Sequence, residues 1–226
     1  MTDPATHRQL YGRRQGHKLR AGQAALVEEL LPALSVPATG PLTAEALFGD
    51  ARPLEVEIGF GAGEHLADQA SARPEIGFVG CEPFLNGMVA ALGHVRERNL
   101  KNVRLYMGDA LDVLERVPDA SLARVYLLHP DPWPKARHAK RRMVNDGPLD
   151  VIAAKLACGG EFRLGTDDPT YCRHAMMVMT ARRDFTWTAR EAADFLTRPA
   201  DWPETRYERK ARLQAHEVWY FRYLRM

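Results

Sequence analysis

The feature that most constrains the fold is a regular alternation, from Pro53 onward, between short apolar segments and longer stretches of helical composition. The expected strands are residues 54–58, 76–81, 103–106, 123–128 and 161–165, and the expected helices are 63–72, 84–97, 109–116, about 143–157 and 169–181. This order is typical of βαβ units, in which helices cover both faces of a mainly parallel sheet. We therefore predict an α/β fold that binds its ligands at the carboxyl ends of the strands.

The regions outside this alternation are assigned to the same domain and to a short arm. The chain has 226 residues, and residues 21–226 are expected to form a single domain. Within it, a helical segment at 22–34 should stop near Pro32, and the aromatic tail at 217–225 should add a closing strand. Residues 1–20 are polar and basic with few core-forming side chains, so we expect a mobile arm there.

Charge is nearly balanced over the chain, with 31 Lys and Arg against 29 Asp and Glu. Two segments without acids, 7–20 and 135–142, each carry five Lys and Arg side chains. This distribution indicates local phosphate contacts or, alternatively, an ordinary solvated surface, and it argues against a polycationic tail.

Composition also excludes several classes of protein. No apolar run approaches 18 residues, and no apolar segment follows the basic N-terminus, so we expect neither a membrane span nor a secretory signal. Cys81, Cys158 and Cys172 are far apart and odd in number, which favours buried thiols over a disulfide framework or a metal site. A cytoplasmic protein without a metal is the resulting expectation.

A glycine-rich turn follows the first expected strand, with Gly59, Gly61 and Gly63 at alternate positions. The layout of strand, glycine turn and helix is that of a nucleotide-binding site. The turn lacks the G-x-G-x-x-G spacing, because position 64 is Glu, and this disfavours a nicotinamide oxidoreductase. Glu57 and Glu64 flank the turn, and their carboxylates suit the sulfonium and ammonium groups of S-adenosylmethionine better than a diphosphate. The alternative is a purely structural turn.

Acids also follow the next two expected strands. Glu82 lies about 20 residues past the glycine turn, where a carboxylate can accept hydrogen bonds from both ribose hydroxyls. The alternative role is to open the following helix. Asp109, before Ala110, could accept from the adenine amine or cap the next helix. Acids at successive strand ends together favour an adenosyl ligand.

The fourth expected strand ends in a stiff, basic loop, His-Pro-Asp-Pro-Trp-Pro-Lys, at 129–135. The three prolines hold the backbone extended and present Asp131 and Trp133 between them. Trp can stack on a flipped base, and a carboxylate can accept hydrogen bonds from the base edge. A basic run follows at once, so we interpret the loop as a base-binding site beside an RNA-binding surface. A turn with a packed indole is the alternative.

This loop, with Glu57-Ile58-Gly59-Phe60-Gly61, Thr166-Asp167, Arg198-Pro199 and Thr205-Arg206-Tyr207-Glu208, resembles the bacterial tRNA (guanine-N7)-methyltransferase family over about residues 53–225. The resemblance implies a Rossmann-like class I methyltransferase fold with a seven-stranded, mainly parallel sheet, an antiparallel C-terminal strand, and helices on both faces. It implies methyl transfer from S-adenosylmethionine to N7 of a guanosine in the variable loop of tRNA, by a monomer or a homodimer.

The resemblance also implies roles for residues at matching positions. The cofactor would contact Glu57, Gly59, Gly61, Glu82, Asp109, Ala110 and Asp131, with Asp131 also catalytic. The substrate guanosine would contact Lys135, Asp167, Thr205, Arg206, Tyr207 and Glu208. The remaining RNA would contact Arg137, His138, Lys140, Arg141 and Arg142.

Three departures from the family pattern remove none of these residues. His129 replaces the usual aromatic and receives no role, Pro83-Phe84-Leu85-Asn86-Gly87 matches loosely, and Lys210-Ala211 replaces Arg-Gly. Two alternative functions stay open at this point. One is an exocyclic-amine RNA methyltransferase, although a single proline separates Asp131 from Trp133. The other is an RNA-binding module with a non-catalytic cofactor pocket.

Overall fold

The protein was analysed as a computed structural model that describes residues 16–226. The strands are β1 (Leu54–Ile58), β2 (Gly77–Cys81), β3 (Val103–Tyr106), β4 (Leu122–Leu128), β5 (Leu156–Thr166), β6 (Phe185–Trp187) and β7 (Trp219–Arg225). The helices are α1 (Ala21–Leu34), α2 (Ala44–Phe48), α3 (Glu64–Ala72), α4 (Leu85–Glu97), α5 (Ala110–Leu114), α6 (Asp146–Lys155), α7 (Pro169–Ala181), α8 (Ala193–Leu196) and α9 (Arg206–Leu213), with a 3-10 helix η1 (Ala136–Arg141).

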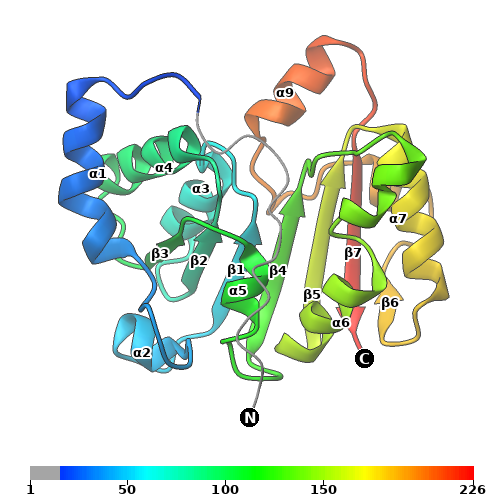
Figure 1. The fold of residues 1–226 in the computed structure, drawn as a ribbon. Coiled ribbons are helices and arrows are strands. Elements are labelled where there is room, and N and C mark those ends of the chain that lie inside the picture. The colour runs from blue at the N-terminus through cyan, green and yellow to red at the C-terminus, as the bar shows by residue number, and fades with distance from the viewer. Residues whose placement is uncertain (1–15) are drawn as a thin grey trace.

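The seven strands form one sheet in the order β3-β2-β1-β4-β5-β7-β6 (Figure 1). β1 to β5 pair in parallel, whereas β7 runs antiparallel to both of its neighbours, β5 and β6. This arrangement confirms the predicted seven-stranded, mainly parallel sheet and its antiparallel closing strand. Strand order reverses between β1 and β4, and the carboxyl ends of these two strands mark the expected ligand site.

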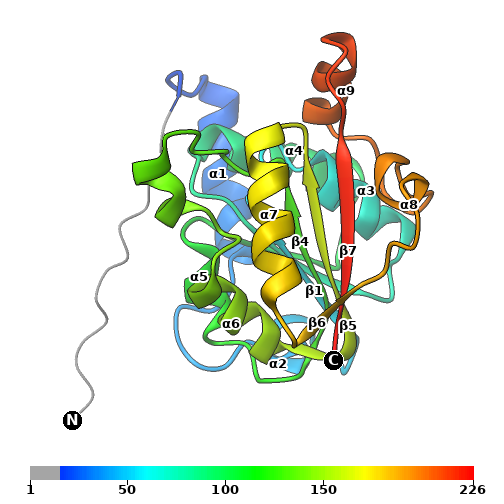
Figure 2. The same cartoon turned by 90° about the vertical axis from the view of Figure 1, so that its right-hand side faces the viewer.

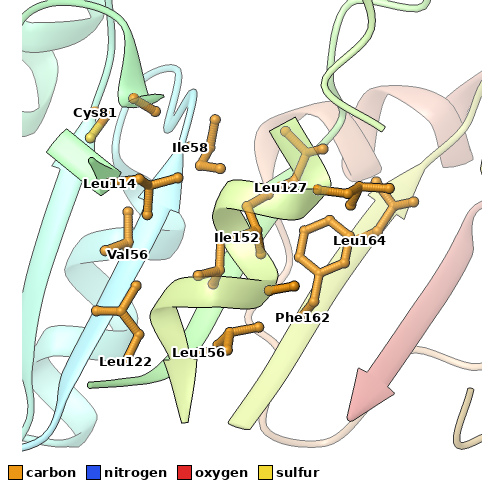
Figure 3. Packing of buried hydrophobic residues seen from close by; sticks show 14 of the residues in the cluster. Val56, Ile58, Cys81, Leu114, Leu122, Leu127, Ile152, Leu156, Phe162 and Leu164 are labelled. Carbon is orange, nitrogen blue, oxygen red and sulfur yellow. The ribbon is translucent and has the colours of Figure 1, made fainter. Parts of the chain in front are cut away.

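Helices cover both faces of the sheet, as Figure 2 shows with α5, α6 and α7 on one side and α3 and α4 behind. The first face buries Val56, Ile58, Leu127 and Phe162 against α5 to α7 in one apolar cluster (Figure 3). The second cluster joins α1, α3 and α4 to β2 and β3. Both faces of β1 are buried, although its second face carries the acids Glu55 and Glu57 instead of apolar side chains.

The second face of the sheet also buries a charged network beneath β4, β5 and β7. Glu161 has a side chain only 6% exposed, and it accepts hydrogen bonds from Arg124 Nε at 2.8 Å, Arg163 Nε at 2.8 Å and Arg222 Nε at 2.5 Å. The Arg163 side chain is fully buried, and its Nη2 donates to Asp201 Oδ2 at 2.6 Å. Asp201 precedes α9, so the network ties the C-terminal segment to the sheet.

The expected elements that precede residues 129–135, here called the proline loop, are present with ends shifted by a few residues. Three features differ from the prediction. α1 continues through Pro32 to Leu34, and the turn after the proline is closed by Ser35 N, which donates to the Leu31 carbonyl at 2.8 Å. β5 begins at Leu156, where the expected helix was still running. The proline loop at 129–135 is followed by η1, which Asn145 stabilises by donating to the carbonyls of Ala139 and Arg142.

The N-terminal arm was expected over residues 1–20, and residues 1–15 lie outside the described residues. The described end of that segment is attached to α4. Gly16 N donates to Asn86 Oδ1 at 2.8 Å, and Asn86 Nδ2 donates to the His17 carbonyl at 3.0 Å. Over residues 16–226, no helix combines the length and the apolar character needed to span a membrane.

Candidate active site

Two adjoining cavities open at the carboxyl edge of the sheet, above the point where strand order reverses. The first cavity, about 510 Å³, lies between the glycine turn, the end of β2, and the proline loop. The second cavity, about 610 Å³, lies between the proline loop, the end of β5, and the segment that leads into β7. Both volumes are in the range of small-molecule sites. The two cavities share four lining residues, which are His129, Pro130, Asp131 and Tyr207.

The glycine turn forms one wall of the first cavity. Gly61 has φ +61° and Gly63 has φ +79°, a backbone region that favours glycine. A Cβ on Gly63 would lie 2.7 Å from the Ala91 Cβ, so this glycine also permits close packing on α4. A Cβ on Gly61 would lie 3.2 Å from Tyr207 Cε2, because the tyrosine of α9 closes over the turn. Gly59 and Gly61 both line the cavity, as expected.

Glu82 faces the same cavity from the end of β2, and its residue is only 8% exposed. Its Oε2 accepts from Gly61 N at 2.8 Å and its Oε1 accepts from Phe84 N at 3.0 Å. Burial raises the pKa of Glu82 above its usual value, the two backbone hydrogen bonds oppose that rise, and the charges of Asp131 and Glu57 add to it. This excess of negative charge favours a cationic ligand.

Glu57 and Asp109 approach the end of β2 but do not line the first cavity. Glu57 is 3% exposed, and its Oε2 lies 2.8 Å from His65 Nδ1 on α3. Asp109 caps α5 by accepting from Leu111 N at 3.0 Å, and Ala110 is buried in the core. Burial, then the charges of Asp109, Glu82 and Glu57, raise the pKa of the Cys81 thiol. The carboxylates therefore gather around one strand end, with only Glu82 and Asp131 at the cavity surface.

The proline loop brings Asp131 and Trp133 to the site. Asp131 is exposed in the wall that the two cavities share, and within residues 16–226 no hydrogen bond holds its carboxylate. Trp133 has φ +44° and lines the first cavity. The guanidinium of Arg141 lies 4.9 Å from the indole centre, and the His138 ring meets the indole edge-on at 5.9 Å. Trp133 therefore packs against Arg141 and His138 and also lines the first cavity.

The basic run divides into inward and outward side chains. Arg142 is 6% exposed and donates to the carbonyls of Pro132 at 2.9 Å and Trp133 at 3.0 Å, so its guanidinium stabilises the loop from inside. Lys135, Arg137 and Lys140 are exposed beside the cavity mouth. Partial burial, followed by the charges of Arg141, Arg137 and Lys135, lowers the pKa of His138.

The C-terminal motif is split in the same way. Thr205 Oγ1 caps α9 by accepting from Glu208 N at 3.0 Å, and Glu208 Oε1 accepts from Tyr220 OH at 2.7 Å and pairs with Arg198 at 3.1 Å. These two residues are buried and hold the helix. Arg206 and Tyr207 instead line the first cavity, and Tyr207 lines the second as well. In Figures 1 and 2, α9 projects beyond the carboxyl edge of the sheet.

The second cavity combines acids, imidazoles and aromatic rings. Asp167, at the end of β5, lines this cavity together with His216 and Trp219 from the segment around β7. Sequence analysis assigned no role to His129, His216 or Trp219. The position of His129 directly after β4 was a usable signal, whereas His216 and Trp219 reach the site only through the antiparallel return of the chain.

The arrangement suits the transfer of a small group between two ligands. One cavity carries buried negative charge and a glycine turn open to a ligand backbone, and the other carries acceptors and flat rings suited to a planar polar ligand. Because the two cavities adjoin along four shared lining residues, ligands that fill both would approach each other beside Asp131.

Comparisons with known proteins agree with this geometry. A family whose sequence model is described as "Putative methyltransferase" matches residues 51–221. The tRNA (guanine-N(7)-)-methyltransferase of Zymomonas mobilis subsp. mobilis is 62% identical over 224 residues, covering 99% of this chain and 97% of the relative. The enzyme of the same name from Sphingopyxis alaskensis is 62% identical over 229 residues, with the same coverage of both chains. Among solved structures, an rRNA methylase from Streptococcus thermophilus superimposes with a TM-score of 0.52 at 12% identity, covering 78% of this chain and 89% of the other, and this likeness shows the fold alone.

Proposed function

This chain belongs to the bacterial tRNA (guanine-N7)-methyltransferase family, and on that premise we propose that it transfers a methyl group from S-adenosylmethionine to N7 of a guanosine in the variable loop of tRNA. The observation that carries the proposal is the shared wall of the two cavities. It would place a methyl donor in the first cavity next to a guanine in the second, with Asp131 beside the point where the two meet. The cytoplasm is the expected compartment for this reaction.

The residues of the first cavity fit S-adenosylmethionine. Each oxygen of Glu82 accepts one backbone hydrogen bond and keeps a lone pair for a ribose hydroxyl. The surplus of carboxylates, which raises the pKa of Glu82, suits the positive sulfonium and ammonium groups. Glu57 would act through the electric field of its negative charge. Its contact with His65 also joins β1 to α3, the two elements that flank the glycine turn. The bound cofactor supplies an electrophilic methyl group.

Methyl transfer to N7 requires the protein to position the two reactants and to stabilise the positive charge that develops on the purine. Guanine N7 carries a lone pair in the ring plane and no proton, so no general base is needed. The purine gains positive charge as the new bond forms, and a preorganised carboxylate nearby stabilises that charge. Within residues 16–226, the Asp131 carboxylate makes no hydrogen bond, so it is suited to this role and to orienting the N–H edge of the base. Asp167 offers a second carboxylate to that edge, and Tyr207 offers a ring against its face.

The direct test is to incubate the purified protein with bulk tRNA and methyl-labelled S-adenosylmethionine, and then to identify the labelled nucleoside. We expect label in 7-methylguanosine, and a tRNA whose variable-loop guanosine is replaced by adenosine should remain unlabelled. Label in a methylated exocyclic amine would replace this proposal with the alternative chemistry. Adenosylhomocysteine that fails to bind, with tRNA that does bind, would instead favour a non-catalytic RNA-binding module.

The outward basic side chains beside the cavity mouth should contact phosphate. We expect the double substitution Arg137→Ala and Lys140→Ala to weaken tRNA binding and to reduce the slope of log affinity against log salt by roughly 1 to 2. The matched control is Arg96→Ala with Lys101→Ala, two exposed basic residues at the opposite edge of the sheet. Filter binding from low to moderate salt measures both slopes. Equal slopes for the two double variants would place Arg137 and Lys140 away from the RNA.

A further inference from the structure

His129 occupies the wall between the two cavities and has no part in the function proposed above. It is the first residue after β4, and its backbone N donates to the Gly165 carbonyl at 2.7 Å, which fixes it beside the end of β5. Its φ is +49°, an uncommon backbone region for a residue other than glycine. Its side chain is only 5% exposed, yet it lines both cavities. A strained residue at this position suggests a role at the site beyond filling space.

The imidazole contacts Asp167 and Tyr207, two residues that line the second cavity. Nδ1 lies 3.1 Å from Asp167 Oδ1, and because an ionised carboxylate can only accept, the imidazole donates through Nδ1–H. The hydrogen bond from His129 is the largest influence on Asp167 and lowers its pKa below the usual value, against the opposing effect of burial. The carboxylate is thus kept ionised and fixed on one side. The ring also stacks on Tyr207, with 6.0 Å between centres and 24° between planes.

We propose that His129 is the positioning residue of the guanosine pocket, which fixes the Asp167 carboxylate toward the base and supports the ring of Tyr207. The proposal rests on the function proposed above and adds a residue to it. With Oδ1 tied to the imidazole, the partly exposed Asp167 presents Oδ2 to the cavity, where the N1–H and the amino group of guanine offer matching donors. A carboxylate that is fixed before binding loses less conformational freedom when the base arrives.

Two substitutions test the hydrogen bond to Asp167 separately from the ring contact with Tyr207. His129→Phe keeps a ring for Tyr207 and removes the donor to Asp167. His129→Asn places an amide nitrogen close to the position of Nδ1, removes the ring, and tolerates the positive φ well. We expect His129→Phe to raise the KM for tRNA roughly ten- to hundredfold, the usual effect of losing a hydrogen bond to a charged group. His129→Asn should stay within about threefold of the wild type, and the Kd of adenosylhomocysteine should stay within about twofold in both variants.

A double-mutant cycle with Asp167→Asn completes the test and does not depend on one variant. If His129 acts through Asp167, adding His129→Phe to Asp167→Asn should raise the KM no further. A KM unchanged in His129→Phe, or additive effects in the cycle, would overturn the proposal. A loss of adenosylhomocysteine affinity equal to the rise in KM would overturn it too, because it would indicate a purely structural role. Failure of the proposed function is distinguishable, since the wild-type protein would then form no 7-methylguanosine.

Discussion

Replacing Asp131 by Asn is expected to lower the turnover of tRNA methylation by about a hundredfold or more at saturating tRNA and S-adenosylmethionine. The substitution keeps the size and shape of the side chain but removes the negative charge from the wall between the cavities. In the transition state the purine gains positive charge, so the lost stabilisation acts on turnover more than on binding. Asp131 has no hydrogen-bond partner within residues 16–226, so the fold should not depend on it.

The measurement is single-turnover methylation of tRNA, with thermal unfolding and adenosylhomocysteine calorimetry on the same preparations. Asp119→Asn is the matched control, because Asp119 is 75% exposed at the opposite edge of the sheet. We expect wild-type turnover from the control and near-wild-type unfolding from both variants. Wild-type turnover from Asp131→Asn would remove this residue from the chemistry, whatever its position in the cavity wall.

Replacing Glu161 by Gln is expected to lower the free energy of unfolding by about 3 to 5 kcal/mol, the usual result of removing one partner from a buried ion pair. The amide has nearly the volume of the carboxylate, so the loss is electrostatic. Arg124, Arg163 and Arg222 all donate to Glu161, and the Arg163 side chain is fully buried. Without the carboxylate, the buried Arg163 guanidinium and the partly exposed Arg124 and Arg222 lose the negative charge that they share.

The contribution of Glu161 to stability should depend on pH in a direction set by its pKa. Burial alone would raise the pKa of Glu161, but Arg163, Arg222 and Arg124 lower it below its ordinary value of 4.5. The stabilisation is therefore complete above pH 4.5 and is lost as the pH falls through the lower pKa of the folded protein.

Denaturant unfolding between pH 8 and pH 3 measures this contribution. The gap between wild type and Glu161→Gln should be constant at neutral pH and should close in acid. Glu97→Gln, an exposed glutamate on α4, serves as the control and should stay within about 0.5 kcal/mol of the wild type. A gap below about 1 kcal/mol at pH 7 would mean that the arginines find other partners or water.

The sheet could be predicted from sequence because its signal is local. An alternating segment such as 54–58, Leu-Glu-Val-Glu-Ile, followed by a turn with alternate glycines, specifies a strand, its end, and the start of a helix without help from distant residues. The proline loop was also predictable as a stiff element, since proline restricts its own backbone and that of its predecessor. The observed positions of Gly61, Glu82 and Asp131 around one cavity follow from these local rules and from the parallel order of the strands.

The remaining features depend on contacts between distant residues. Arg142 follows other basic residues with no local sign that it would turn inward and bind the carbonyls of Pro132 and Trp133. Thr205 and Glu208 belong to the same short motif as Tyr207, but helical geometry directs them to the interior and Tyr207 to the cavities. Composition gives no means to separate such neighbours before the packing of α9 is known.

The position of Glu57 changes how the cofactor site is understood. Sequence analysis placed four carboxylates around the ligand as equal contacts. The structure places Glu82 and Asp131 at the surface of the first cavity, with Glu57 bonded to His65 and Asp109 capping a helix. The shared effect on Glu82 and Cys81 shows that all four still contribute to one field of negative charge.

The central claim is that a methyl donor and a guanine occupy neighbouring cavities that adjoin beside Asp131. A crystal structure of the protein with adenosylhomocysteine tests it most directly. The account predicts ribose hydroxyls on Glu82, the homocysteine ammonium among the carboxylates beside the glycine turn, and the sulfur facing the wall formed by His129, Pro130, Asp131 and Tyr207. Adenosylhomocysteine in the second cavity, or with its sulfur turned away from that wall, would contradict the account.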